Sequence, residues 1–170
     1  GIGFGSTATT GAYAGTLLSS INLGVSADNA SLTDAAGTTA ALTLDGGDGF
    51  DRLNGNASAN TLTLTGLNQG TLDQVSFSNI ENLYLKGGND TVNIESGGRL
   101  SGILDGGAGT NTLVIKDGSS IAIDKDGKIK IGGGSFTGFK SIQVGGSGGS
   151  QTNKVTLNSE SNTALITGPN

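Results

Sequence analysis

The chain has 170 residues, enough for one domain with a substantial core, and its 34% hydrophobic and 14% charged residues argue against a disordered polymer. Its net charge of −5 argues against nucleic acid as a partner, because phosphate binding requires a basic surface. The chain holds 32 Gly and lacks His, Cys, Met and Trp, which excludes a Ser-His-Asp triad and any Cys/His metal site.

The segment 1–20 consists mostly of small and polar residues, and we assign no element there beyond an N-terminal stretch or an edge coil. The chain begins with Gly, so we expect a processed or excised piece of a longer protein. Spanning a membrane as a helix takes about 18 consecutive apolar residues, and no run approaches that length. We therefore predict no membrane insertion of this segment.

From residue 21 onward, short runs that alternate apolar and polar residues recur about every 20 positions. Alternation with period two indicates half-buried strands. The recurring aliphatic positions are Leu23, Leu44, Leu64, Leu85, Leu104, Ile123, Val144 and Leu165, and a looser second row contains Leu32, Leu53, Val75, Val92, Leu113, Ile131 and Val155. We expect the first row to form one buried column, with at least two strands and two glycine turns in each repeat.

A short, fixed period with glycine at the corners is typical of a solenoid, in which stacked coils bury a continuous core. The sequence therefore predicts an all-β fold: a single β-solenoid domain over residues 21–168, with about 20 residues per coil. An antiparallel sandwich or barrel is the alternative. Such a fold would not need aliphatic residues at nearly constant spacing.

A longer repeat overlies the short one and indicates a duplicated module of three coils. The matching segments are Leu44–Leu53 with Leu104–Leu113, at an offset of 60, and Ser76–Leu85 with Ser135–Val144, at an offset of 59. Each copy of the second segment contains one aromatic residue near its start, Phe77 or Phe136, which we expect to fill the core.

These two segments, L-D-G-G-x-G-T-N-T-L and S-F-x-x-[IF]-x-x-[LI]-x-[LV], resemble the repeats of bacterial autotransporter passenger domains and related large surface adhesins. The similarity covers residues 40–168. The resemblance implies a right-handed parallel β-helix, located outside the cell or on the bacterial cell surface. It also implies a non-enzymatic stalk and interaction surface. The implied partners are a surface protein or glycan of a host or neighbouring cell, or further copies through the solenoid edges.

The segment Gly46–Asn54 also fits G-G-x-G-x-D-x-U-x, the calcium-binding repeat of RTX proteins. Calcium takes six to eight oxygen ligands, which adjacent turns supply only when the motif is repeated in tandem. Here the next copy, Gly106–Leu113, is not adjacent to the first and has Asn111 in place of the required Asp. We therefore predict a metal-free turn, with a calcium-binding RTX-type segment as the alternative function.

Some parallel β-helices cleave polysaccharides, which requires carboxylates converging on one face. Stacked coils would place Lys86, Asp105 and Asp124 in one row, too sparse for such a site, so a carbohydrate-active domain is a less favoured alternative. We predict no catalytic residue, no cofactor and no metal site. Three asparagines that precede strands are expected to connect the coils through their side-chain amides: Asn60, Asn82 and Asn111.

Overall fold

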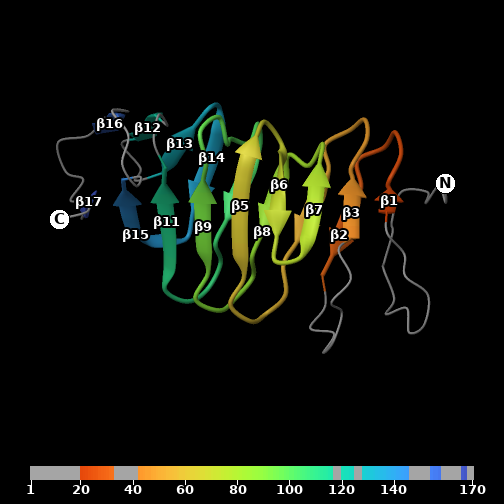
Figure 1. Cartoon of the computed structure of the whole chain (residues 1–170), viewed down its shortest axis with the longest axis horizontal. Coiled ribbons are helices and arrows are strands. Elements are labelled where there is room, and N and C mark those ends of the chain that lie inside the picture. Colours follow the sequence, from red (N-terminus) through yellow and green to blue (C-terminus); the bar gives the residue numbers. More distant parts are fainter. Residues whose placement is uncertain are drawn as a thin grey trace.

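The computed structural model describes residues 20–32, 42–116, 120–124, 128–145, 154–157 and 166–167. These residues form seventeen short strands and no helix, which confirms the predicted all-β class (Figure 1). In this described part of the chain, no helix is long and apolar enough to cross a membrane. Residues 1–19, most of the unassigned N-terminal stretch, lie outside the described residues.

The strands form two mixed sheets. The nine-stranded sheet contains, in spatial order, β1 (Ser20–Asn22), β3 (Leu42–Asp45), β7 (Val75–Ser78), β6 (Gln69–Leu72), β5 (Thr61–Gly66), β9 (Thr91–Ile94), β11 (Asn111–Ile115), β15 (Phe139–Val144) and β17 (Ile166–Thr167). The eight-stranded sheet contains β16 (Lys154–Leu157), β12 (Ser120–Ile123), β13 (Ile129–Ile131), β14 (Gly134–Thr137), β10 (Ile103–Asp105), β8 (Asn82–Tyr84), β4 (Arg52–Asn54) and β2 (Asn29–Ser31).

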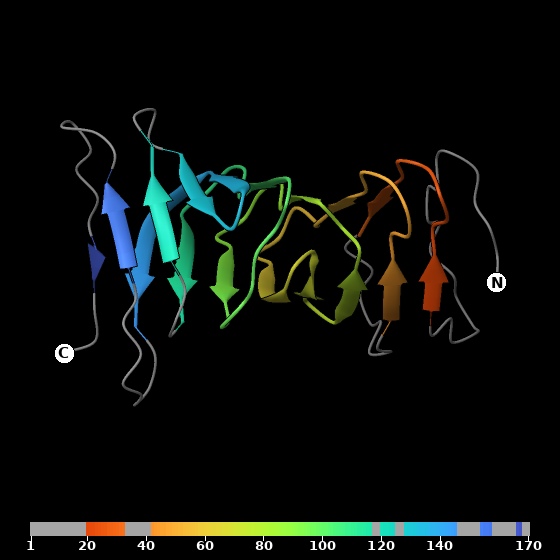
Figure 2. The same ribbon diagram turned by 90° about the horizontal axis from the view of Figure 1, so that it is seen from above.

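The chain passes back and forth between the two sheets, so that strands far apart in sequence pair in parallel (Figure 2). In the eight-stranded sheet β2, β4, β8 and β10 follow one another as parallel neighbours. The corresponding neighbours in the other sheet include β5, β9 and β11. Only the segments β5–β6–β7 and β12–β13–β14 pair in antiparallel fashion among the described strands.

Inward-facing aliphatic side chains of the two sheets form one hydrophobic core. In the eight-stranded sheet the register places Leu53 beside Leu83, and Leu83 beside Leu104. Leu104 in turn pairs with Phe136, and all four side chains are fully buried. A matching column in the nine-stranded sheet consists of Leu62, Val92, Leu113 and Ile142. The alternating pattern therefore located the buried faces of these strands correctly.

The single column predicted from the regular spacing is wrong, although its members from Leu23 to Ile123 are buried. Leu44 pairs with Phe77 and not with Leu64, because β7 and β6 lie between β3 and β5. Contacts between neighbouring parallel strands span 21 positions in one case and 33 in another, because the antiparallel segments insert extra strands into some turns. Leu165, the last member, lies outside the described residues.

The two copies of the repeated segment contain one equivalent strand pairing. Leu44 of β3 pairs with Phe77 of β7, and the equivalent Leu104 of β10 pairs with Phe136 of β14. Both phenylalanines are buried, as expected. The prediction that one copy of the module comprises three coils is wrong, however. From β3 to β10 the chain crosses between the sheets five times, an odd number, so the second copy begins in the opposite sheet.

Candidate functional site

The turn that connects β3 to β4 packs directly on the turn of the neighbouring strand pair. Gly47 has a φ of 86°, and a Cβ there would overlap the carbonyl oxygen of Gly24. The equivalent Gly107 has a φ of 69°, and its Cβ would overlap the carbonyl oxygen of Lys86. Glycine is therefore required at both positions for two reasons, the left-handed backbone and the close approach of adjacent turns.

Asp45, the last residue of β3, connects three neighbouring strands. Its Oδ1 accepts hydrogen bonds from the backbone N–H of Gly47 at 3.2 Å and from Asn79 Nδ2 at 2.8 Å. The same oxygen accepts one from the hydroxyl of Ser78 at 3.3 Å, and Oδ2 accepts one from Asn22 Nδ2 at 2.9 Å. One carboxylate thus connects the neighbouring strands β1, β3 and β7.

Three acidic side chains stack at the corner where the chain enters β2, β4 and β8, and we call Asp28, Asp51 and Glu81 the acidic corner. Asp51 Oδ1 accepts the backbone N–H of Asp28 at 2.8 Å, and Glu81 Oε2 accepts the backbone N–H of Asp51 at 2.8 Å. The three residues are only 3%, 0% and 9% exposed. Asp51 and Glu81 therefore each bind the neighbouring corner by accepting a backbone N–H, of Asp28 and of Asp51, that would otherwise have no partner.

The acidic corner is electrostatically unfavourable for an ionised Asp51. Burial raises the pKa of Asp51 above its ordinary value of 3.8, the hydrogen bond from the Asp28 N–H opposes this rise, and the charges of neighbouring acids add to it. Those acids are Glu81, Asp28 and Asp45. Asp51 Oδ2 and both carboxylate oxygens of Asp28 are buried without a hydrogen-bond partner.

A second column stands at the corner where the chain enters β5, β9 and β11. Asp90 Oδ1 accepts the backbone N–H of Asn60 at 2.8 Å, and Asn111 Oδ1 accepts that of Asp90 at 2.9 Å. Asn111 Nδ2 then donates to the carbonyl of Gly138 at 2.9 Å. Asn82 belongs to the other corner, where its Oδ1 accepts a backbone N–H at 3.2 Å. The three asparagines therefore connect turns as predicted, but through backbone groups and Asp90, not as one stack of amides.

The row of Lys86, Asp105 and Asp124 considered for catalysis does not form. Asp105 ends β10, whose neighbours are β8 and β14, whereas Asp124 follows β12, whose neighbours are β13 and β16. Two strands, β14 and β13, therefore separate the carboxylates, because the antiparallel segment is inserted between them. Asp105 Oδ1 instead accepts the N–H of Gly107 at 2.9 Å, a local turn contact.

The two acidic residues of the calcium-like motif face different environments. Asp51 is buried in the acidic corner, whereas Asp48 is exposed at the tip of the turn. Across the part of the chain that the structure describes, no three Asp, Glu, His or Cys residues converge in a way that could hold a metal ion. That the turn is metal-free stays a prediction, to be tested by chelation.

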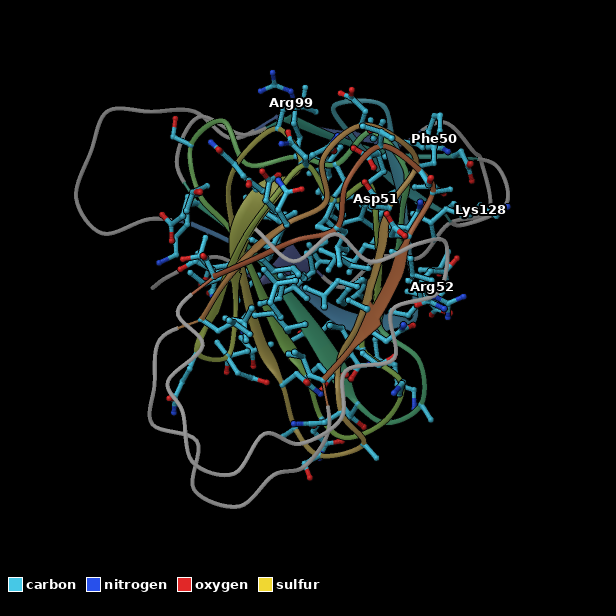
Figure 3. The ribbon with its side chains drawn as sticks, turned by 90° about the vertical axis from the view of Figure 1, so that its right-hand side faces the viewer. Phe50, Asp51, Arg52, Arg99 and Lys128 are labelled. Atoms are coloured by element: carbon cyan, nitrogen blue, oxygen red, sulfur yellow. The ribbon has the colours of Figure 1, made fainter. Side chains whose placement is uncertain are left out.

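Two exposed side chains, Val25 and Phe50, lie on the outside of the acidic corner near two half-buried ones, Arg52 and Tyr84, and we call these four residues the corner patch. Val25 is 80% and Phe50 71% exposed, on turns joined by the hydrogen bond from the Asp48 N–H to the Gly24 carbonyl at 3.0 Å. The Arg52 guanidinium lies 3.7 Å from the centroid of the Tyr84 ring. In Figure 3 Phe50 and Arg52 project outward, whereas Asp51 lies nearer the interior.

Sequence reasoning did not single out the corner patch, although a signal for it exists. Phe50, Asp51 and Arg52 stand where the second copy of the module has Thr110, Asn111 and Thr112. The two copies therefore share their turn geometry and differ in the residues that could carry a function. In comparisons with protein-family models, curated proteins and solved structures, no match to this chain was found.

Proposed function

We propose that the chain is a right-handed parallel β-helix that serves as a stalk and interaction surface in a bacterial cell-surface or secreted protein. The parallel succession of β2, β4, β8 and β10, with the intervening strands in the facing sheet, supports the helical winding. Crossover connections between parallel strands of one sheet are nearly always right-handed, which supports the hand. The resemblance of the repeats to adhesin repeats supports the location and the adhesive role.

The observation that carries the proposal is how the buried polar side chains are used. Asp51, Asp90 and Asn111 each accept a backbone N–H from the preceding turn, so they join turn to turn. Stacked turns rise by about 4.8 Å each, the spacing of paired strands. A chain that uses its buried polar groups for stacking is suited to extend a rod and to present its outer surface.

The corner patch is the surface that we assign to contact a partner. It offers an exposed aromatic ring at Phe50 and an exposed aliphatic side chain at Val25, next to the stacked pair of Arg52 and Tyr84. Tyrosine and arginine are over-represented among the residues that dominate protein interfaces. The proposed partner is a surface protein or glycan of a host or neighbouring cell, or a second copy of this chain.

The experiment is an adhesion assay with beads coated with the full chain and offered to cultured epithelial cells. We expect saturable binding that falls about tenfold, equivalent to ~1.4 kcal/mol, in a variant that combines Val25→Ala with Phe50→Ala. Treating the cells with protease or with glycosidase distinguishes a protein from a glycan partner. Bead aggregation without cells would identify self-association.

The matched control is Leu67→Ala, because Leu67 is also an exposed aliphatic residue, 49% exposed, but lies between β5 and β6 in the other sheet. This variant should bind as the unchanged chain does. Absence of adhesion and of self-association in the unchanged chain would refute the proposed function. Equal losses in both variants would refute the assignment to the corner patch.

A further inference from the structure

The two copies of the module contain the same corner with one chemical difference, Asp51 in the first and Asn111 in the second. In the first copy the N–H of Gly46 donates to the carbonyl of Ser78 at 3.0 Å. In the second copy the N–H of Gly106 donates to the carbonyl of Thr137, also at 3.0 Å. Asp51 Oδ1 and Asn111 Oδ1 each accept the backbone N–H of the preceding turn, at 2.8 and 2.9 Å. The second copy is therefore an internal reference for the first.

In the reference copy, the remaining atom of the side chain is a donor. Asn111 Nδ2 donates to the carbonyl oxygen of Gly106 at 2.8 Å and to that of Gly138 at 2.9 Å. A Cβ built on Gly106 would lie 2.9 Å from Asn111 Nδ2 and 3.1 Å from the Gly138 oxygen. The amide thus fits between the two carbonyls and closes the corner.

In the first copy the same place is taken by an acceptor. A Cβ built on Gly46 would lie 2.7 Å from Asp51 Oδ2 and would overlap the carbonyl oxygen of Asn79, the counterpart of Gly138. Asp51 Oδ2 is fully buried and has no hydrogen-bond donor. An ionised carboxylate at this place would face carbonyl oxygen without a proton between them, which is costly in a buried site.

The charged groups packed around Asp51 do not compensate for a negative charge. The charged side chains that interact with Asp51 are all acidic: Asp28 next to β2, Glu81 next to β8, and Asp45 at the end of β3. On its own strand the neighbouring Arg52 is engaged elsewhere, with its Nε donating to Asn54 Oδ1 at 2.7 Å and its guanidinium over the Tyr84 ring. Burial and these acids raise the pKa of Asp51, in agreement with the geometry.

We propose that Asp51 is held as the neutral carboxylic acid, with Oδ2–H donating to the carbonyl oxygen of Asn79, and that loss of this proton loosens the acidic corner. The corner is then a pH-sensitive latch between the turns that carry β2, β4 and β8. Phe50 precedes Asp51 directly, so the state of the latch also affects how the corner patch is presented. The second copy, with an amide at Asn111, has the same contact without the pH dependence.

The test compares the full chain with two variants, Asp51→Asn and Asn111→Asp, in chemical unfolding at a series of pH values in buffer with EDTA. In the unchanged chain, one extra bound proton makes the unfolding equilibrium constant rise by up to about tenfold per pH unit above the ordinary pKa of Asp. Asp51→Asn should make the unfolding equilibrium constant depend less steeply on pH, by the contribution of one proton, and should be more stable than the unchanged chain at neutral pH. Asn111→Asp should make this dependence steeper by the contribution of one proton. An Asn111→Asp variant that folds only in acid would therefore also support the latch.

Two results of the unfolding experiments would overturn the proposal. One is an Asp51→Asn variant with the same pH slope as the unchanged chain. The other is a rise in stability when calcium is added at neutral pH that is lost in Asp51→Asn, because a cation would then occupy the place assigned to the proton. Carbon-13 NMR of labelled aspartate gives an independent readout in the unchanged chain. An Asp51 carboxyl that titrates at or below the ordinary value would contradict the latch, and one that titrates above it would support it.

Discussion

Replacing Leu83 by alanine tests the core column of the eight-stranded sheet. Leu83 lies in register between Leu53 and Leu104, and all three are fully buried. The substitution removes three carbon atoms, which at about 0.8 kcal/mol each gives a transfer cost of ~2.4 kcal/mol. A cavity adds to this cost, because parallel pairing fixes the strands on both sides and hinders collapse, so we expect a total of about 3–4 kcal/mol.

The assay for Leu83→Ala is urea unfolding followed by circular dichroism. With a slope of about 2 kcal/mol per molar urea, the midpoint should fall by roughly 1.5–2 M. Leu67→Ala removes the same atoms from a side chain that is 49% exposed, and should change the stability by less than about 0.5 kcal/mol. A loss below about 1 kcal/mol for Leu83→Ala, or equal losses in the two variants, would refute the assigned column.

Four further outcomes are expected. Gly107→Ala should lower the melting temperature markedly, because its Cβ would overlap the carbonyl of Lys86; an unchanged melting temperature would contradict the close packing of the turns. Leu85→Asp should prevent folding of several turns, as a charge would enter a fully buried site, and a folded, soluble variant in circular dichroism would count against the core. EDTA should leave the melting temperature nearly unchanged, whereas a calcium site at 100 times its Kd would add about 2.7 kcal/mol, a gain that chelation would remove. Burial raises the pKa values of Asp51 and Asp90, so the stability that these carboxyls contribute is present below the ordinary pKa of 3.8 and is lost as the pH rises through their higher values in the folded chain. Asp90→Asn should therefore lose less stability as the pH rises, measured by unfolding at a series of pH values. A pH profile identical to that of the unchanged chain would contradict this prediction.

The strands and their buried faces could be predicted from the sequence, because alternation is a local property. Leu62 and Leu64 are buried while Thr61 and Thr63 are not, as period two requires. Pairing partners could not be obtained from spacing alone. The antiparallel β5–β6 and β6–β7 connections change which strands are adjacent, and their local signal is a left-handed residue in each turn, Asn68 with a φ of 56° and Asp73 with a φ of 54°.

In the candidate site, too, the local motif could be predicted from the sequence, whereas the contacts between distant residues could not. The motif around Asp51 is visible in the sequence, and so is its replacement by Asn111 in the second copy. The stacking of Asp51 with Asp28 and Glu81 depends on separations of 23 and 30 positions, which a single fixed period does not produce. The exposure of Phe50 was also not predictable from composition, because aromatic residues are more often buried.

The most direct test of the account uses engineered cysteine pairs, because the natural chain has no cysteine. The register places Thr43 beside Ser76, whereas Thr63 lies three strands away from Thr43, beyond β7 and β6. Paired strands are about 4.8 Å apart, within the range that a disulfide can bridge, and three strands exceed it. The variant Thr43→Cys with Ser76→Cys should therefore form an intramolecular disulfide on mild oxidation, detected by mass spectrometry, and Thr43→Cys with Thr63→Cys should not. Bridging in the second pair and not in the first would match the regular spacing of the sequence repeat and contradict the stacked arrangement described above.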